Sequence, residues 1–283
     1  SIHYDLLGVT DLCFTDQVNP TVDVLFLCTA HGDSGHFLQE NPFCEHTRII
    51  DLSNEFRLKA DSRFMGRKFV YGLPEVNRAK IVRAHDIANP GCFATAIQLA
   101  LAPLAANGLL HSDVHVNAIT GSTGAGVKPS ATTHFSWRAD NLSYYKPFTH
   151  QHLGEIEETL TRLNGSLDHE IYFLPLRGNH TRGIFATAYT DFEGDLEQAR
   201  RLYSDFYRSA AFTLLSDAPQ VHLKMAVNTN KCVLGLHKHG NKLLITSVID
   251  NLIKGASGQA VQNMNLMFGL PEDMGLNLKG SAF

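Results

Sequence analysis

A cysteine in a tight turn has the setting that points most directly to chemistry. In the segment Asn89-Pro-Gly-Cys-Phe-Ala-Thr95, a Pro-Gly turn precedes Cys92, and an Ala- and Leu-rich run that predicts a helix follows it. The unbonded backbone N–H groups and the dipole at a helix N-terminus favour an anion, so we expect them to lower the thiol pKa. The same groups can stabilise the oxyanion formed by attack on a carbonyl. We therefore predict that Cys92 is a nucleophile; the alternative is a small, buried structural cysteine.

Two histidines in one short segment supply the second set of candidates. In His150-Gln-His-Leu-Gly-Glu155, His152 lies three residues before Glu155, so the carboxylate can orient the imidazole if a helix begins here. Histidine is the usual partner that takes and returns protons for a cysteine nucleophile near neutral pH. Two alternatives stay open at this point. Both imidazoles could ligate a metal, although no third ligand has an obvious spacing, and Glu155 could simply be an acid at a helix N-terminus.

Glycine-rich loops and scattered cations complete the candidate groups. The loop Gly121-Ser-Thr-Gly-Ala-Gly126 follows an apolar run, and residues 250–259 are similarly rich in small side chains. Such loops let the backbone approach a phosphate or a nicotinamide closely, although they also permit tight packing alone. The cationic candidates for a substrate phosphate or carboxylate are Arg177, Arg182 and Lys254; each could equally be a solvated surface charge.

The composition bounds the classes of partner. The 283 residues are 44% hydrophobic and 18% charged, which is typical of a globular protein, and the formal net charge of -4 offers no basic surface for nucleic acid or an anionic membrane. Polar residues, a proline and a glycine interrupt the longest apolar stretch, 94–110, which a bilayer core would penalise. The five cysteines form an odd set without a CxxC pair, which favours a reduced compartment. We expect a cytoplasmic protein with no nucleic-acid or membrane partner.

The early part of the chain predicts a parallel sheet covered by helices, the α/β arrangement. Its strand-like apolar runs are residues 22–28, 48–51 and 87–88. A final helix over 256–268 has an apolar stripe at helical spacing, and we expect it to return to this first domain. Residues 1–90 and 255–283 are therefore assigned to one domain.

The pattern changes after a helix predicted over 94–106, which Asn107-Gly108 would end. Further strand-like runs are residues 114–120, 170–174, 184–190, 232–237 and 243–249. The last two alternate in hydropathy and are joined by residues 238–241, which is typical of a hairpin. We predict a largely antiparallel sheet with helices on one face, including 196–209, in a second domain over 91–254.

The usual opening of a dinucleotide-binding domain is not evident before Val22. Such a domain begins with a strand, a GxGxxG turn and a helix that hold the cofactor pyrophosphate. Either this interpretation of the fold is wrong or the chain lacks its natural beginning.

Eight segments, in one order along the chain, resemble the N-acetyl-gamma-glutamyl-phosphate reductase family of arginine biosynthesis. They are Cys28-Thr-Ala-His-Gly32, Asp51-Leu-Ser-Asn-Glu-Phe-Arg57, Tyr71-Gly-Leu-Pro-Glu75, Asn89-Pro-Gly-Cys-Phe-Ala-Thr95, Gly121-Ser-Thr-Gly-Ala-Gly126, His150-Gln-His-Leu-Gly-Glu-Ile156, His180-Thr-Arg-Gly-Ile184 and Asp250-Asn-Leu-Ile-Lys-Gly-Ala-Ser-Gly-Gln-Ala260. A set that spans essentially the whole chain is far more specific than any one member. The chain departs from the family in two ways. Asn89 stands where the family usually has histidine, and the family's opening strand, glycine-rich turn and first helix, about forty residues, have no counterpart. The resemblance therefore implies that the pyrophosphate contacts lie upstream of this chain.

The resemblance implies a fold and a set of site residues. The fold is a Rossmann-type dinucleotide-binding domain joined to an α+β substrate and dimerisation domain of the semialdehyde dehydrogenase type. Cys92 is implied as the nucleophile, and His152 as the acid/base with Glu155 near it. The assigned cofactor contacts are Thr29, His31, Gly32, Ser122, Gly124, His150 and Asn251. The assigned substrate contacts are Asn89, Arg182 and Lys254, and no metal is expected.

The implied reaction is the NADPH-dependent reduction of N-acetyl-gamma-glutamyl phosphate to its semialdehyde. Cys92 attacks the acyl phosphate, phosphate leaves, and hydride from NADPH reduces the resulting thioester, with His152 managing the proton. A homodimer or homotetramer is expected. Aspartate-semialdehyde dehydrogenase is the nearest alternative, which the segments 150–152 and 254–259 disfavour. A non-catalytic binding protein is the alternative of another class, which the intact Cys92 and His152 disfavour.

Overall fold

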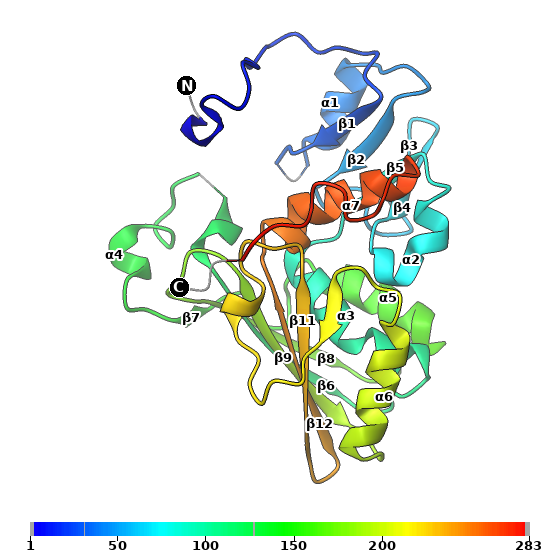
Figure 1. The fold of residues 1–283 in the computed structure, drawn as a ribbon, viewed down its shortest axis with the longest axis vertical. Helices are drawn as coiled ribbons and strands as arrows, with labels where there is room; N and C mark the ends of the chain where they lie inside the picture. Colours follow the sequence, from blue (N-terminus) through cyan, green and yellow to red (C-terminus); the bar gives the residue numbers. More distant parts are fainter. Residues whose placement is uncertain (1–2, 31, 127, 281–283) are drawn as a thin grey trace.

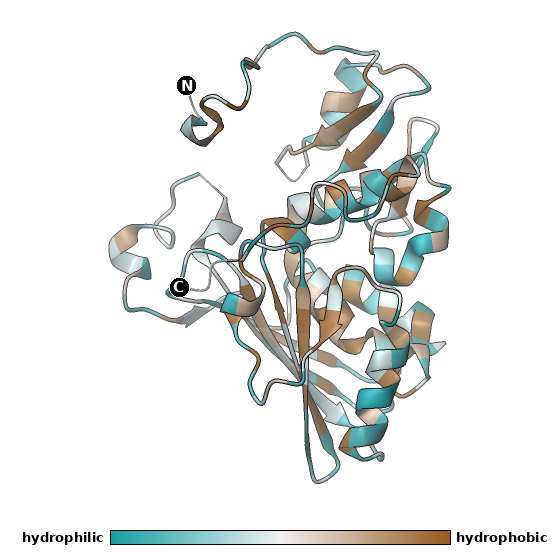
Figure 2. Cartoon of the chain, in the orientation of Figure 1, coloured by the Kyte–Doolittle hydropathy of each residue, from teal (hydrophilic) through white to brown (hydrophobic). Residues whose placement is uncertain are grey.

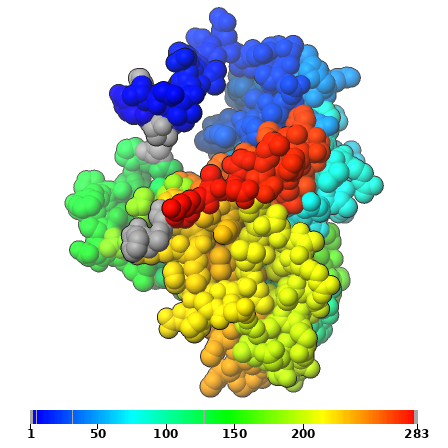
Figure 3. Space-filling view, in the orientation of Figure 1, coloured from blue at the N-terminus to red at the C-terminus, as the bar shows by residue number. Residues whose placement is uncertain are grey.

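The computed structural model describes residues 3–30, 32–126 and 128–280. Two β-sheets lie one above the other along the long axis of the molecule, each with its own helices (Figure 1). The space-filling view shows the last part of the chain, coloured red, crossing the molecule between the early residues and the second sheet (Figure 3). The α/β class predicted from the sequence is confirmed.

The first sheet has five strands, in the order β1-β2-β5-β4-β3. They are β1 (Val24–Leu27), β2 (Arg48–Asp51), β3 (Arg63–Phe64), β4 (Arg67–Tyr71) and β5 (Asp86–Ala88). All neighbouring pairs are parallel except β3 with β4. Ile49, Ile50 and Ile87 are fully buried because helices cover both faces, which explains the continuous apolar runs in the sequence.

Three helices cover this first sheet. They are α1 (Ser34–Glu40), α2 (Pro74–Ile81) and α7 (Gly258–Met267). Leu38 of α1 packs into an apolar cluster on one face, whereas Ile81 of α2 and Leu266 of α7 pack into a cluster on the other. The single helix predicted over 256–268 is wrong in its first turn, where a π-helical turn, η4 (Ile253–Ser257), precedes α7.

The second sheet has seven strands, in the order β10-β11-β12-β9-β6-β8-β7. They are β6 (Val114–Thr120), β7 (Ser143–Tyr144), β8 (Ile171–Arg177), β9 (Ile184–Asp191), β10 (Thr213–Leu215), β11 (Cys232–His239) and β12 (Lys242–Ile249). The predicted hairpin joins β11 to β12, and the sheet is antiparallel except for the pairs β6–β8 and β10–β11. Apolar residues concentrate along its strands (Figure 2).

Helices α3 (Cys92–Ala106), α5 (Leu153–Asn164) and α6 (Leu196–Phe206) pack against one face of the second sheet. The remaining short helices are η1 (Tyr4–Leu6), η2 (Ser122–Ala125), η3 (Leu223–Met225) and α4 (Phe135–Arg138). Pro103 lies inside α3 and cannot donate to the carbonyl of Leu99, which instead accepts the Tyr207 hydroxyl at 2.6 Å. The central helix of the second domain therefore tolerates a proline in its interior.

Candidate active site

The turn that carries Cys92 begins where strand β5 ends. Gly91 is the N-cap of α3, with φ -68° and ψ 153°, and Cys92 is the first residue of the helix. The prediction that Cys92 begins a helix is therefore confirmed. Leu52 and Asn89, which follow the parallel strands β2 and β5, both line the same cavity. In open parallel sheets, ligands bind at this carboxyl edge.

Two glycines allow other groups to pack directly against the turn. A Cβ atom at Gly91 would lie 2.4 Å from Nε2 of His152 and 2.7 Å from Oε1 of Glu155. A Cβ atom at Gly255 would lie 2.8 Å from the Cβ atom of Cys92. The imidazole of His152 therefore lies against the residue that precedes Cys92, and only glycine permits this approach.

Burial dominates the pKa of the Cys92 thiol. The backbone N–H groups of Phe93 and Cys92 and the charge of Arg57 lower this pKa, as expected at a helix N-terminus, but burial raises it to about 11. The expectation of a low thiol pKa is thus wrong, because the desolvation of the thiolate outweighs the helix contribution. The thiol needs a base before it can act as a nucleophile.

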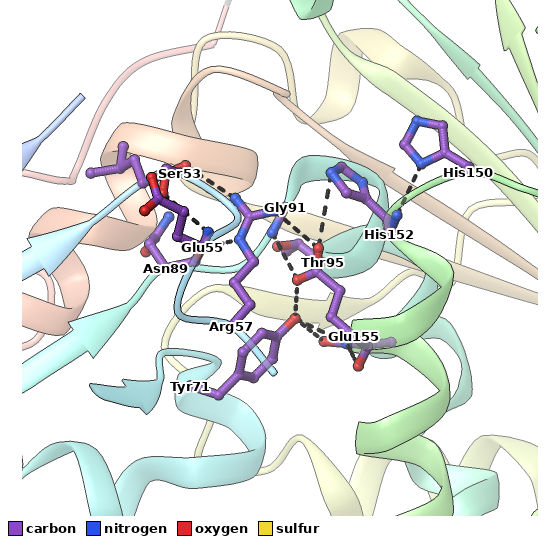
Figure 4. A network of polar contacts seen from close by, with 12 residues as sticks. Ser53, Glu55, Arg57, Tyr71, Asn89, Gly91, Thr95, His150, His152 and Glu155 are labelled. Carbon is purple, nitrogen blue, oxygen red and sulfur yellow. Dashed lines mark hydrogen bonds and ion pairs between the residues drawn. The ribbon is translucent and has the colours of Figure 1, made fainter. Parts of the chain in front are cut away.

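Glu155, near the start of α5, binds the Pro-Gly turn that precedes Cys92. Its buried carboxylate accepts bonds from Nη1 of Arg57 at 3.0 Å, from the hydroxyl of Tyr71 at 2.6 Å and from the N–H of Gly91 at 3.1 Å (Figure 4). Nε2 of His152 lies 3.9 Å from the same carboxylate, close enough for an ion pair when the imidazole is protonated. The two residues are brought together as predicted, but the hydrogen bonds of the Glu155 carboxylate go to Arg57, Tyr71 and Gly91.

Arg57 ties three chain segments together at this place. Besides the ion pair with Glu155, it donates to the carbonyl of Asn89 at 2.9 Å and to that of Leu52 at 3.1 Å. Arg57 and Tyr71 were not among the predicted site residues, although both lie in the family-like segments. Their place in these segments was the signal that the sequence offered. An arginine that a fold buries is seldom without a partner.

His150 is a buried neutral imidazole. Its Nδ1 atom accepts the backbone N–H of His152 at 3.2 Å, and the two rings lie 4.6 Å apart. Burial and the charge of Lys146 lower the pKa of His150 to about 4. Within the described residues, no group of three or more His, Cys, Asp or Glu side chains is arranged to hold a metal ion.

A cavity of about 410 Å³ collects most of the predicted groups. The predicted residues that line it are Asn89, Cys92, Gly124, His150, His152, Arg177 and Asn251. It is also cationic, with Arg57, Arg138, Lys146 and Arg177 in its lining. The guanidinium of Arg177 lies 3.9 Å from the ring centre of Tyr145, and burial together with Arg177 lowers the pKa of Arg138. No local pattern had singled out Arg138 or Lys146.

Arg182 and Lys254 do not line this cavity. Arg182 forms an ion pair with Asp250 at 3.2 Å, and Lys254 is completely buried, 2.7 Å from a carboxylate oxygen of Glu75. Lys254 also donates to Gln262 at 2.9 Å. The Lys254 ammonium is therefore held in a buried ion pair and does not line the cavity. Asn89 lines the cavity, but its amide donates to the carbonyl of Ala256.

The predicted cofactor contacts fall in two groups. Asn251 donates to Thr123 at 3.1 Å and so holds the glycine loop that contains Ser122 and Gly124. Thr29 and Gly32 follow strand β1 at the carboxyl edge of the first sheet, where the Thr29 hydroxyl lies 2.6 Å from that of Ser34. His31 lies outside the described residues. Across the part of the chain that the structure describes, no helix is long and apolar enough to cross a membrane.

Two domain families match the chain. Residues 2–84 match the semialdehyde dehydrogenase NAD binding domain, and residues 92–251 match the semialdehyde dehydrogenase dimerisation domain. The fold is also similar to a crystal structure of aspartate semialdehyde dehydrogenase II from Vibrio cholerae, with a TM-score of 0.66, 16% identity, and coverage of 88% of this chain and 80% of that one. The class of the protein is therefore that of the semialdehyde dehydrogenases.

Close relatives narrow the family further. The chain is 62% identical to the N-acetyl-gamma-glutamyl-phosphate reductase of Christiangramia forsetii, over 100% of this chain and 87% of that protein. It is 57% identical to the enzyme of the same name from Flavobacterium johnsoniae, over 99% of this chain and 86% of that protein. The chain belongs to the N-acetyl-gamma-glutamyl-phosphate reductase family.

Proposed function

We propose that this chain catalyses the NADPH-dependent reduction of N-acetyl-gamma-glutamyl phosphate to N-acetylglutamate semialdehyde, with release of phosphate, in arginine biosynthesis. The observation that carries the proposal is the packing of His152 against the Gly91 turn beside Cys92, in a cavity lined by cations. The 62% identity to a named reductase over the whole chain supports the substrate class.

Cys92 is the proposed nucleophile and His152 the proposed general base. Because the pKa of the thiol is about 11, the thiol must pass its proton to a neighbouring base as it attacks. His152 takes this proton, the Sγ atom bonds to the acyl carbon, and the bond from that carbon to the phosphate oxygen breaks. The N–H groups at the start of α3 stabilise the oxyanion during this step. Phosphate leaves, and a thioester remains on Cys92.

The glycine loop after β6 fits a nicotinamide dinucleotide. Nothing lies within 4 Å of a Cβ position at Gly126, where φ is 75°, so the backbone there is open to a ligand. Bound at this face, NADPH supplies the hydride that reduces the thioester. The proposed contacts are Ser122, Gly124, His150 and Asn251 around this loop, and Thr29, His31 and Gly32 after β1.

His152 completes the cycle. The protonated imidazole neutralises the oxygen of the reduced adduct on Cys92, and then removes that proton as the carbon–sulfur bond breaks. The semialdehyde departs, and the protonated His152 returns its proton to the Cys92 sulfur, which restores the resting thiol and the neutral imidazole. Glu155 holds the turn and stabilises the imidazolium from 3.9 Å.

The substrate carries a phosphate and a carboxylate, and the cavity offers cations for both. In place of Lys254, we propose Arg138, Lys146 and Arg177 as the contacts for these groups, because all three line the cavity with Cys92. Asn89 borders the same space. Arg182 acts by fixing Asp250, the residue before Asn251.

We further propose the division of the chain and its assembly. Residues 1–90 and 255–283 form the NADP-binding domain, and 91–254 form the catalytic and dimerisation domain; the packing of α7 beside α2 supports the return of the last segment. The face of the second sheet away from α3, α5 and α6 supports a homodimer, or a tetramer built from it. The five free cysteines agree with a cytoplasmic location.

A comparison of two substrates tests the function. In the reverse direction, with phosphate and NADP⁺, we expect turnover on N-acetylglutamate semialdehyde to exceed that on aspartate semialdehyde. A preference for aspartate semialdehyde would instead assign to the chain the activity of an aspartate-semialdehyde dehydrogenase. Measuring the same reaction with NAD⁺ tests the cofactor preference.

The variant Cys92→Ser tests the covalent route. Serine cannot form the required anion near neutral pH, so reduction should be abolished while the melting temperature stays near that of the wild type. The matched control is Cys232→Ser, which removes a thiol outside the cavity lining. Turnover near the wild-type value in Cys92→Ser would rule out the thioester.

A further inference from the structure

A second cleft, of about 1090 Å³, adjoins the network that holds the Cys92 turn. Strand β4, helix α2, helix α5 and the segment 57–66 contribute its lining. Arg57 lines both this cleft and the catalytic cavity, whereas Tyr71 and Glu155 line the second cleft but not the first. The hydrogen-bond network of Arg57, Glu155 and Tyr71 therefore connects the second cleft with the catalytic cavity.

The lining of this cleft is far more basic than the molecule as a whole. Its 22 lining residues include seven arginines and lysines and four acids, in a chain whose formal net charge is -4. The cationic members are Arg57, Lys59, Arg67, Lys68, Lys80, Arg83 and Arg162. Three of the four acids are already bonded: Asp86 to Arg67 at 2.9 Å, Glu155 to Arg57 at 3.0 Å, and Glu158 to the backbone N–H of Lys59. A positive field is therefore left over.

Most of the remaining cations have no acidic partner. Within residues 3–30, 32–126 and 128–280, no ion pair involves the side chains of Lys59, Lys68, Lys80, Arg83 or Arg162, and all five are exposed. They come from β4, α2 and the turn after it, α5, and the segment after β2. Like charges gathered around one hollow repel one another, so their arrangement favours an anion.

We propose that this cleft binds a small molecule that carries two or more phosphate groups. Arginine binds phosphate in a bidentate manner and lysine supplies a compact charge, so cations on several elements suit separated phosphate groups. Such a ligand bridges β4 and α2 of the first sheet with α5 of the second. A ligand bound in the cleft also places negative charge beside Arg57, so its binding changes the turnover number of the enzyme. This last consequence rests on the proposed function.

Calorimetric titration with inorganic pyrophosphate tests the binding site. The titration is done without NADP⁺, because NADP⁺ itself carries several phosphate groups. The variant Arg177→Gln, which removes a cation of the catalytic cavity, should keep the binding of pyrophosphate at the cleft. We expect wild-type protein to bind pyrophosphate under these conditions, and the variant Lys68→Glu/Arg83→Glu to bind about tenfold or more weakly. Neither residue belongs to the catalytic cavity, so basal turnover should stay near the wild-type value.

The matched control reverses two charges elsewhere. Lys231→Glu/Lys279→Glu changes the net charge equally, but neither lysine lines the cleft. This control should bind pyrophosphate as the wild type does. Equal weakening in Lys68→Glu/Arg83→Glu and in this control, or loss of all pyrophosphate binding in Arg177→Gln, would overturn the proposal. Because binding is measured by heat, this result does not depend on whether the proposed reaction occurs; the effect of pyrophosphate on turnover is a separate measurement.

Discussion

The thiol of Cys92 is subject to opposing influences, and burial prevails because it desolvates the thiolate. The ionised fraction of a thiol grows as pH rises through its pKa, here about 11. The rate of alkylation of Cys92 by iodoacetamide should therefore stay low near neutral pH and rise toward pH 11. Mass spectrometry of the Cys92 peptide over a pH series measures this rate, with the exposed Cys13 as internal reference. A plateau already reached at neutral pH would show a stable resting thiolate instead.

The two histidines of the site differ in their capacity to exchange protons. The pKa of His150 is lowered to about 4, so this ring stays neutral near neutral pH, whereas His152 lies against the Cys92 turn. His152→Asn should cost ~10²–10⁴-fold in turnover. His150→Asn should mainly raise the Michaelis constant for NADPH. Steady-state kinetics of both variants measure these effects, and the reverse pattern would transfer the acid/base role to His150.

At the scale of the elements, Gly91 decides how closely α5 approaches the start of α3. Gly91→Ala would place a methyl group 2.4 Å from Nε2 of His152, so turnover should fall by ~10²-fold as the imidazole is displaced. Gly154→Ala is the matched control, because its added Cβ atom meets only Leu58, at 3.6 Å. Kinetics and melting curves of both variants provide the test. Equal turnover in the two variants would show that this contact does not position His152.

Lys254 joins η4 to α2 through a buried ion pair with Glu75. Lys254→Met leaves the Glu75 carboxylate buried without its cation, which should cost ~3–5 kcal/mol in the free energy of unfolding. Lys242→Met, which breaks the solvent-exposed pair with Asp191, should change the free energy of unfolding far less. Denaturant unfolding measures both variants. An unchanged stability with a raised Michaelis constant for the acyl phosphate would instead restore Lys254 as a substrate contact.

At the scale of the whole molecule, the second sheet has one face that is turned away from α3, α5 and α6 and is covered in part by η3. His115 on this face stacks between Tyr172 and Tyr189, with ring centres 5.2 and 5.0 Å away. We expect this aromatic face to form the dimer contact, so Tyr189→Glu should shift the protein toward the monomer, since it would bury unpaired charge. Light scattering after size-exclusion chromatography measures the mass. Arg201→Glu on α6, on the helix-covered side, is the control and should leave the mass unchanged.

Much of the fold was predictable because its signals are local. The buried strands β2 and β6 were predicted with the bounds that they have, since apolar runs bounded by polar residues carry their own strand signal. Strand β4 was missed because Arg67-Lys68 opens it and its register depends on its partner β5. Helix α6 ends at Phe206, three residues before the predicted end. Helix ends fray, so the local sequence does not fix the last helical residue.

The sequence by itself determined the turn of Cys92, the pair of histidines and the family, because these depend on neighbouring residues and on the order of motifs. Only the tertiary structure decided the partners of Glu155: Arg57 lies 98 positions away and Tyr71 lies 84 positions away. It also decided the thiol pKa and the burial of Lys254. The physical reason is that desolvation and ion pairing depend on which distant segments pack together, and no local pattern contains that information.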